Sequence, residues 1–208
     1  MLKLKRYYTG FIKNKKIVAV TGLAQGVGTT HLAVMLATYL TNGRHCRVAV
    51  VEYGQHGSYE QMKNVLKYKR VRLSTKALAE HGFSAYGIDF YQSIYQSGAI
   101  GILRENYDVI IIDQSLRANQ FISIEEAAEL WQADMRIAVI SMVPWKWKEC
   151  IWKQNRLMET VEKKRLKTVS MTDAAYRKNE KVLQIPWEPD PFHIKAETIP
   201  WLYRLLEE

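Results

Sequence analysis

A glycine-rich turn between two apolar segments is the part of this sequence best suited to bind a ligand. It reads Thr21-Gly22-Leu23-Ala24-Gln25-Gly26-Val27-Gly28-Thr29-Thr30-His31. Backbone N–H groups in such a turn can point at an anion, glycine lets the anion approach closely, and the helix that follows carries partial positive charge at its start. The pattern therefore predicts a phosphate-binding loop. Its binding residues would be Gly26, Val27, Gly28, Thr29, Thr30 and His31.

The loop lacks the lysine that usually completes a site of this kind. The common pattern is G-x-x-x-x-G-K-[ST], in which lysine reaches the terminal phosphates and the hydroxyl binds magnesium. Here Gly28 and Thr30 match, whereas Thr29 holds the lysine position and Leu23 holds the first glycine position. Asp113, at the end of a strongly apolar run, is a second candidate ligand. Thr30 and Asp113 would hold magnesium if a nucleotide binds.

This window resembles the loop of the ParA/MinD family of deviant Walker P-loop ATPases, which reads K-G-G-V-G-K-T-T. Gly26-Val27-Gly28 and Thr30 match it, and both lysines are absent, at Ala24 and Thr29. In that family the first lysine crosses the dimer interface to the partner's nucleotide, and the second holds the terminal phosphates. Threonine in place of the second lysine resembles the TadZ/CpaE branch, which helps to place pilus-assembly machinery.

Two further family motifs are partly retained. The expected D-x-D-P-Q-G after the second strand is Glu52-Tyr53-Gly54-Gln55-His56-Gly57 here, so the aspartate that orients the attacking water falls on Gly54. Asp113 matches the Walker B carboxylate, and 185–192 resembles the segment near the adenine pocket. Each lost charge or donor typically costs roughly 3 kcal/mol of the barrier. The resemblance thus implies weak or no hydrolysis, and no residue is assigned a catalytic role. Binding of ATP or ADP with magnesium and a loop that binds no cofactor stay as alternatives.

Strand-like and helix-like segments alternate along the chain, which predicts an α/β fold with a mostly parallel sheet and helices on both faces. With the resemblance, this becomes a single P-loop NTPase-like domain over 16–208, preceded by a basic arm at 1–15. The expected strands are 16–21, 47–52, 88–91, 107–113, 136–143, 168–170 and 182–185. The expected helices are 31–40, 58–69, 123–131, 144–162 and 197–206.

Composition excludes several classes of protein. The 208 residues are 48% hydrophobic and 25% charged, which is typical of a globular domain and not of a disordered chain. No apolar run reaches the roughly 18 residues of a membrane span, and the basic N-terminus lacks the apolar segment of a secretory signal. Cys46 and Cys150 are too far apart for a metal motif and suggest buried thiols. We expect a cytoplasmic protein, with peripheral membrane association as an alternative.

Positive charge is concentrated in three segments. The net charge is +9, and the basic residues cluster at 1–16, 61–79 and 144–167. Such clusters attract nucleic acid, anionic lipid or an acidic protein, or they are simply solvated.

The third basic segment also holds three of the six tryptophans. On a helix, Trp145, Lys148 and Trp152 share one face, whereas Trp147 and Cys150 lie on another. One face can pack on the sheet while the other presents aromatic and basic groups. The predicted interaction surface comprises Trp145, Lys146, Trp147, Lys148, Trp152 and Lys153. The alternative, which the sequence favours slightly, is that the tryptophans only cover the edge of the sheet and the lysine stems lie along it. If the face does bind, a protein partner or a homodimer is the preferred occupant, and a membrane surface and nucleic acid are the alternatives.

Three functions compete on these observations. The preferred one is a degenerate ParA/MinD-like factor for spatial organisation or assembly of pilus, secretion or division machinery. The second is an active partition or secretion ATPase whose missing lysine comes from Lys13, Lys15, Lys16 or a partner. The third is a nucleic-acid-binding module that needs no nucleotide.

Overall fold

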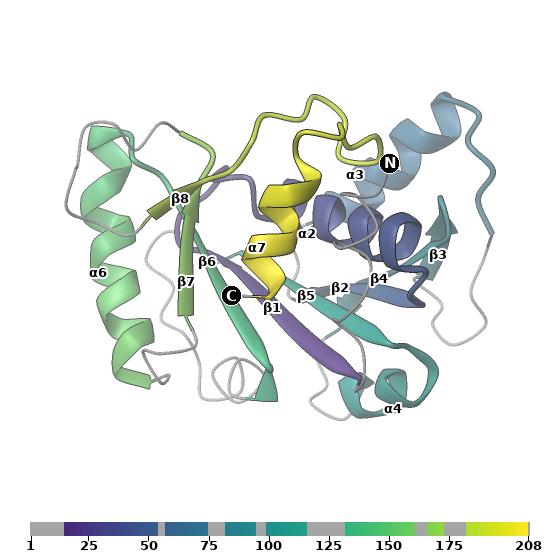
Figure 1. The fold of residues 1–208 in the computed structure, drawn as a ribbon, viewed down its shortest axis with the longest axis horizontal. Helices are drawn as coiled ribbons and strands as arrows, with labels where there is room; N and C mark the ends of the chain where they lie inside the picture. The colour runs from purple at the N-terminus through teal and green to yellow at the C-terminus, as the bar shows by residue number, and fades with distance from the viewer. Residues whose placement is uncertain are drawn as a thin grey trace.

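A computed structural model describes residues 15–53, 57–74, 82–94, 99–115, 132–160, 166–172 and 182–207. Most of the predicted basic arm, the predicted helix at 123–131 and positions 54–56 lie outside this part of the chain. The described residues form one eight-stranded sheet in the order β3-β4-β2-β5-β1-β6-β7-β8 (Figure 1). The strands are β1 Lys16–Gly22, β2 Val48–Tyr53, β3 Gly82–Ala85, β4 Ile88–Ile94, β5 Val109–Ser115, β6 Met135–Ile140, β7 Leu166–Ser170 and β8 Val182–Gln184.

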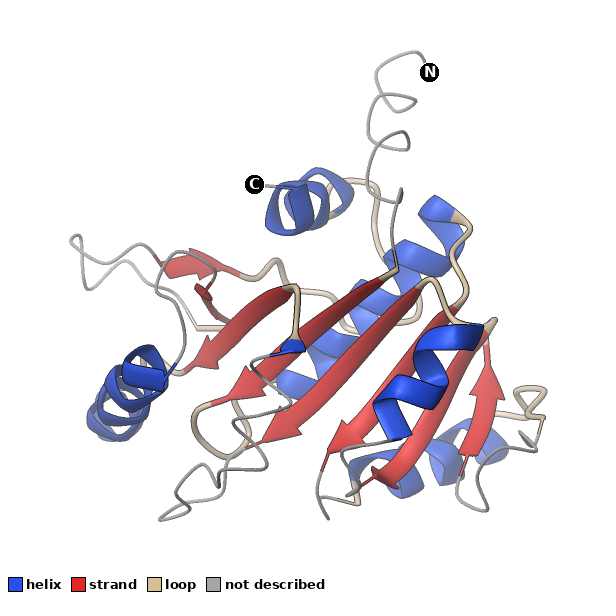
Figure 2. Cartoon of the chain, turned by 90° about the horizontal axis from the view of Figure 1, so that it is seen from below, coloured by secondary structure: helices blue, strands red, loops and turns tan. Residues whose placement is uncertain are grey.

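Helices lie on both faces of the sheet (Figure 2). They are α2 Thr29–Thr38, its π-helical continuation η1 Tyr39–Gly43, α3 Ser58–Tyr68, α4 Ala99–Asn106, α6 Pro144–Thr160 and α7 Ile199–Glu207. No helix in the described ranges is long and apolar enough to cross a membrane.

The centre of the sheet is parallel and strongly apolar. β1 lies between β5 and β6, and β2 pairs with β5 on its other side, all in parallel register. Every residue of β2 is buried, as is all of β1 except Lys16. Strands covered on both faces need this continuous apolar character, which is why the sequence pattern could be read as a parallel sheet. The α/β prediction is confirmed.

The edge of the sheet departs from the sequence prediction. β3 is an additional strand that runs antiparallel to β4. A tight turn at Tyr86 and Gly87 joins the two strands, and both residues have positive φ, 53° and 78°. This is the backbone of a two-residue hairpin, but tyrosine replaces the usual asparagine or aspartate at its first position. The predicted strand at 136–143 is shorter than expected and ends at Ile140, and α4 was not predicted.

The two cysteines occupy apolar surroundings. Cys46 and Cys150 are both buried free thiols, which confirms the prediction for them. Burial raises the pKa of Cys46 to about 11, so this thiol stays protonated at neutral pH.

Candidate functional site

The glycine-rich turn connects the carboxyl end of β1 to the first residue of α2. Gly28 has a φ of 94° and is the N-cap residue of the helix, so the N-cap residue makes no side-chain hydrogen bond to the helix start. A Cβ on Gly28 would stand 2.7 Å from Cγ of Met171, and a Cβ on Gly22 would stand 2.0 Å from Oγ1 of Thr29. Glycine is therefore required at both ends of the turn. The uncapped N–H groups of the first helical turn are those that a bound anion would satisfy.

Asp113 lies beside this helix start and is buried. In the sheet it is in register with Val20 of β1 and Glu52 of β2. Burial raises the pKa of Asp113 to about 7, and hydrogen bonding from the Thr30 hydroxyl opposes that rise. Among the described residues, Oδ2 of Asp113 has no hydrogen-bond partner. The structure thus brings together the two residues that the sequence proposed as magnesium ligands.

The Tyr59 side chain covers the same carboxyl group from α3. Tyr59 is completely buried, and its hydroxyl lowers the pKa of Asp113. Within the described part of the chain, however, neither the Tyr59 hydroxyl nor Oδ2 of Asp113 reaches hydrogen-bond geometry. Both atoms have unused hydrogen-bonding capacity in an apolar setting, which is costly unless the two groups move to pair with each other or a ligand or ion satisfies them.

Glu52, the residue of β2 next to Asp113 in the sheet, accepts hydrogen bonds from the backbone at the start of α3. Its Oε1 accepts hydrogen bonds from the backbone N–H groups of Ser58 at 2.8 Å and Tyr59 at 3.4 Å. The carboxylate therefore caps the start of α3, where the N-cap residue, Gly57, makes no side-chain cap of its own. These two bonds explain why an acid suits that position.

A magnesium ion fits the residues that are present. In the described ranges, no group of three or more His, Cys, Asp or Glu side chains could hold a metal ion by itself. Magnesium does not need such a group, because it usually keeps several waters and binds through one or two protein oxygens plus the phosphates of a nucleotide. One hydroxyl and one carboxylate with an unsatisfied oxygen match that requirement.

The loop itself supplies no positive side chain. Ala24 and Thr29, at the positions of the two family lysines, are both buried. A lysine from elsewhere does reach the loop: Nζ of Lys146, in the first turn of α6, donates a hydrogen bond to the backbone oxygen of Gln25 at 2.8 Å. The sequence placed Lys146 only in an interaction surface, because nothing local links it to a loop 121 positions earlier.

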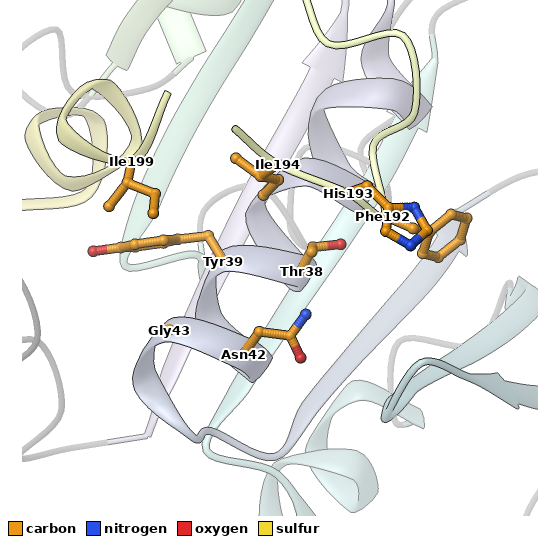
Figure 3. Close-up of a pocket in the computed structure, with 8 residues that line it drawn as sticks. All are labelled: Thr38, Tyr39, Asn42, Gly43, Phe192, His193, Ile194 and Ile199. Atoms are coloured by element: carbon orange, nitrogen blue, oxygen red, sulfur yellow. The ribbon is translucent and has the colours of Figure 1, made fainter. Parts of the chain in front are cut away.

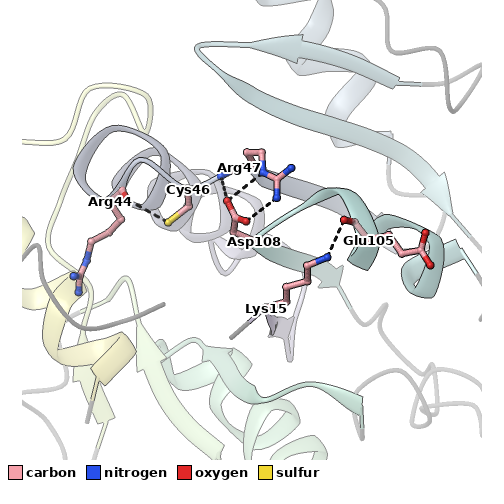
Figure 4. A network of polar contacts seen from close by, with 6 residues as sticks. All are labelled: Lys15, Arg44, Cys46, Arg47, Glu105 and Asp108. Atoms are coloured by element: carbon pink, nitrogen blue, oxygen red, sulfur yellow. Dashed lines mark hydrogen bonds and ion pairs between the residues drawn. The ribbon is translucent and has the colours of Figure 1, made fainter. Parts of the chain in front are cut away.

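The expectation that Lys15 or Lys16 supplies the missing charge is not supported. Lys15 precedes β1 and Lys16 is its first residue, whereas the loop follows the last residue of β1. The seven residues of β1 span roughly 23 Å, which separates these lysines from the loop. Nζ of Lys15 donates to the backbone oxygen of Glu105 at 2.8 Å (Figure 4). Lys13 lies outside the described residues.

An ion pair occupies that same opposite edge of the sheet. The Arg47 guanidinium pairs with the Asp108 carboxylate at 2.9 Å (Figure 4). Its hydrogen bonds lower the pKa of Asp108. This cluster joins the starts of β2 and β5 and is structural.

His31 and Trp187 meet beside the first turn of α2. Their rings are nearly parallel, at 9°, with centroids 6.5 Å apart. Burial lowers the pKa of His31, and a hydrogen bond to the Glu188 backbone opposes this lowering. Trp187 is 72% exposed. An exposed aromatic ring thus stands next to the helix start, in the segment expected near an adenine pocket.

The tryptophan–lysine segment forms the start of α6, and its two faces differ as predicted. Trp145, Lys148 and Trp152 are exposed. Trp147 and Lys153 are buried, and Lys153 pairs with Glu149 at 2.7 Å. Of the six residues named from the sequence, three therefore lie on the outer face, two lie inside, and Lys146 turns to the loop.

A separate cavity of about 300 Å³ lies at the other end of α2. Figure 3 shows Thr38 and Asn42 on the helix below the loop that carries His193 and Ile194. Thr38 is eight residues from Thr30, or roughly 12 Å along the helix. The cavity is therefore distinct from the phosphate loop.

Comparison with known proteins identifies the architecture. No family model matches the sequence, and no curated protein matches it in sequence. Solved structures do match. A plasmid partition protein from Borrelia burgdorferi B31, solved with AMPPNP bound, is 14% identical with a TM-score of 0.62, covering 93% of this chain and 98% of that one.

Two further structures extend this similarity. A ParA family ATPase from Chlorobium tepidum TLS is 14% identical with a TM-score of 0.55, covering 93% of this chain and 92% of that one. The MinC:MinD cell division complex of Aquifex aeolicus matches at 12% identity with a TM-score of 0.58, covering 91% of this chain and 78% of that one. The chain has the ParA/MinD fold.

The ParA/MinD fold accounts for the placement of the candidate site. In open α/β sheets, ligands bind at the carboxyl ends of the strands, at the point where the strand order changes direction. Here β1 lies next to both β5 and β6, and the loop, Asp113 and Lys146 all lie at the carboxyl ends of these three strands or directly after them. The fold and the residues thus indicate the same edge.

Proposed function

We propose that this chain is a nucleotide-binding ParA/MinD-like protein that acts in spatial organisation or assembly, with weak or no ATP hydrolysis. One observation carries the proposal. Oδ2 of buried Asp113 has no hydrogen-bond partner among the described residues, and its carboxyl group lies beside Thr30 in the first turn of α2, which follows Gly28 without a side-chain cap from that residue. A magnesium nucleotide would satisfy both of these groups.

ATP or ADP is the ligand class that these groups fit. The phosphates would lie against the N–H groups of the first turn of α2, with backbone from Gly26 to Thr30 around them. Thr30 and Asp113 would hold the magnesium ion, directly or through water. The ion would neutralise charge on the phosphates. The exposed ring of Trp187 would offer a stacking surface for the base.

Hydrolysis would be slow because the groups that stabilise its transition state are missing. Ala24 and Thr29 provide no ammonium group, and Gly54 provides no carboxylate to orient water. Each such loss typically costs roughly 3 kcal/mol, or about a hundredfold in rate. A protein with these losses would act through its nucleotide-bound state and not through turnover.

The role in assembly rests on the resemblance and on one surface. The MinD of Aquifex aeolicus was solved in complex with its partner MinC. In this chain, Trp145 is 80% and Trp152 is 44% exposed on the outer face of α6, with Lys148 between them. Exposed tryptophan is enriched at protein-binding hot spots. We propose a protein partner or a second copy of the chain as the occupant of this face.

Phosphate release from ATP tests the absence of efficient hydrolysis. We expect the wild type and Asp113→Asn to release phosphate at the same background rate in the presence of magnesium, because the groups that lower the barrier to hydrolysis are absent. The assay should run with the purified chain at several protein concentrations, so that a dimer can form. Turnover well above background that Asp113→Asn abolishes would contradict the proposal and favour an active ATPase.

A further inference from the structure

We infer that Lys146 provides, within the same chain, an ammonium group at the rim of the phosphate loop, beside the position of the first family lysine, and that it binds the terminal phosphates of the nucleotide. It does not replace the groups absent at Thr29 and Gly54, on which slow hydrolysis rests. This inference rests on the proposed nucleotide binding and names the residue that completes the site. The sequence alone offered no such residue in the loop.

The contact between α6 and the loop is direct. Nζ of Lys146 lies 2.8 Å from the backbone oxygen of Gln25 and 3.9 Å from the place where a Cβ on Gly26 would stand. Gln25 and Gly26 directly follow Ala24, which occupies the position of the first family lysine. The ammonium group therefore lies at the rim of the loop, beside the position where charge was lost.

The sheet explains why a residue so distant in sequence can reach the loop. β6 pairs in parallel with β1, so the two strands end side by side at the carboxyl edge. The loop follows β1, and α6 begins four residues after the end of β6. Backbone N–H groups of Lys146 and Trp147 both donate to the Val143 oxygen at 3.0 Å, which fixes the first turn of α6.

The chemistry of the lysine side chain suits a phosphate at this place. An ammonium group has three N–H donors, and the Gln25 oxygen takes one of them. The side chain is partly exposed, so the group stays accessible to a ligand at the loop rim. A hydrogen bond from a cation to phosphate is about twice as strong as a neutral one.

The other two lysines of this part of α6 do not contact the phosphate loop in the same way as Lys146. Lys148 is exposed on the opposite, outer face of α6, and buried Lys153 pairs with Glu149. Lys148 therefore serves as a matched control: the same residue type on the same helix, two positions away. The inferred contact is made within one chain, whereas the first family lysine reaches across a dimer, so it would not require dimerisation.

The test is calorimetric titration of magnesium ATP, ADP and AMP into the wild type and the variants Lys146→Gln, Lys146→Arg and Lys148→Gln. Glutamine retains an N–H group for the Gln25 oxygen but removes the charge, and arginine retains the charge. We expect Lys146→Gln to weaken ATP binding about tenfold or more and AMP binding much less. Lys146→Arg should stay within about threefold of the wild type, and Lys148→Gln should not differ from it.

Each outcome decides one claim. ATP affinity that is unchanged in Lys146→Gln, or lowered equally for ATP and AMP, would overturn the inference and leave nucleotide binding intact. Absence of binding by the wild type up to millimolar ATP would overturn the proposed function and the inference together. Lys146→Ala gives a second variant if glutamine perturbs the fold, and thermal unfolding of each nucleotide-free variant identifies such a change.

Discussion

Replacing Asp113 with asparagine should stabilise the magnesium-free, nucleotide-free protein at pH 8 by up to about 4 kcal/mol. The pKa of this buried carboxyl rises from 3.8 to about 7 in the folded state. Each unit of difference corresponds to about 1.4 kcal/mol, so a shift of about three units costs on the order of 4 kcal/mol once the group ionises. Asparagine has the same shape and no charge to bury.

The pH dependence of this gain has a definite sign. Because the folded state holds the Asp113 proton more tightly than the unfolded state, the contribution of this group to stability falls as pH rises from about 4 to about 7. Urea unfolding of wild type and Asp113→Asn at pH 5 and pH 8, in the presence of EDTA, measures the effect. The gain should be large at pH 8 and much smaller at pH 5.

Asp108→Asn is the control for this prediction, because the pKa of Asp108 is lowered by its pair with Arg47. That substitution should not stabilise the protein at pH 8. A variant Asp113→Asn that is no more stable than the wild type at pH 8 would show that the carboxylate is already compensated, which would remove the main argument for an ion beside Thr30.

Gly28→Ala should destabilise the protein by about 3 kcal/mol and disrupt the loop. Part of the cost comes from a left-handed backbone at φ 94°, which costs a residue with a Cβ about 1–2 kcal/mol. The rest comes from the new methyl group, which would approach Cγ of Met171 to 2.7 Å. Urea unfolding at neutral pH measures the total.

Gly57→Ala separates the two causes. Gly57 has a positive φ of 68° as well, but among the described residues a Cβ there meets nothing within 4 Å. It should show the backbone cost alone. The double variant Gly28→Ala/Met171→Ala should recover the part of the lost stability that comes from contact with Met171. This recovery would appear as a coupling energy between the two positions in a double-mutant cycle. Equal effects of Gly28→Ala and Gly57→Ala would refute the close approach of Met171 to the loop.

The parts of the site that the sequence predicted are those with local signals. Gly28 and Thr30 are recognisable because glycine and hydroxyl spacing reflects the geometry of one turn, and Asp113 because it ends a continuous apolar strand. The two faces of α6 followed from helical spacing, which correctly separated exposed Trp145 from buried Trp147. Similarity to the TadZ/CpaE branch, by contrast, stays a prediction.

The parts that the sequence missed depend on long-range pairing. Lys146 reaches Gln25 only because β6 lies next to β1, and His31 meets Trp187 only because the late loop crosses the start of α2. Lys15 was a misleading candidate because it is near the loop in sequence but lies across the full length of β1. β3 was missed because it is four residues long and its turn lacks the usual residues.

Magnesium-dependent binding of ATP and ADP, measured by calorimetry with Thr30→Ala and Asp113→Ala as controls, tests the central claim most directly. The account predicts micromolar binding by the wild type that weakens strongly when magnesium is removed and is lost in both variants. Absence of binding by the wild type up to millimolar nucleotide, or binding that both variants retain, would contradict it.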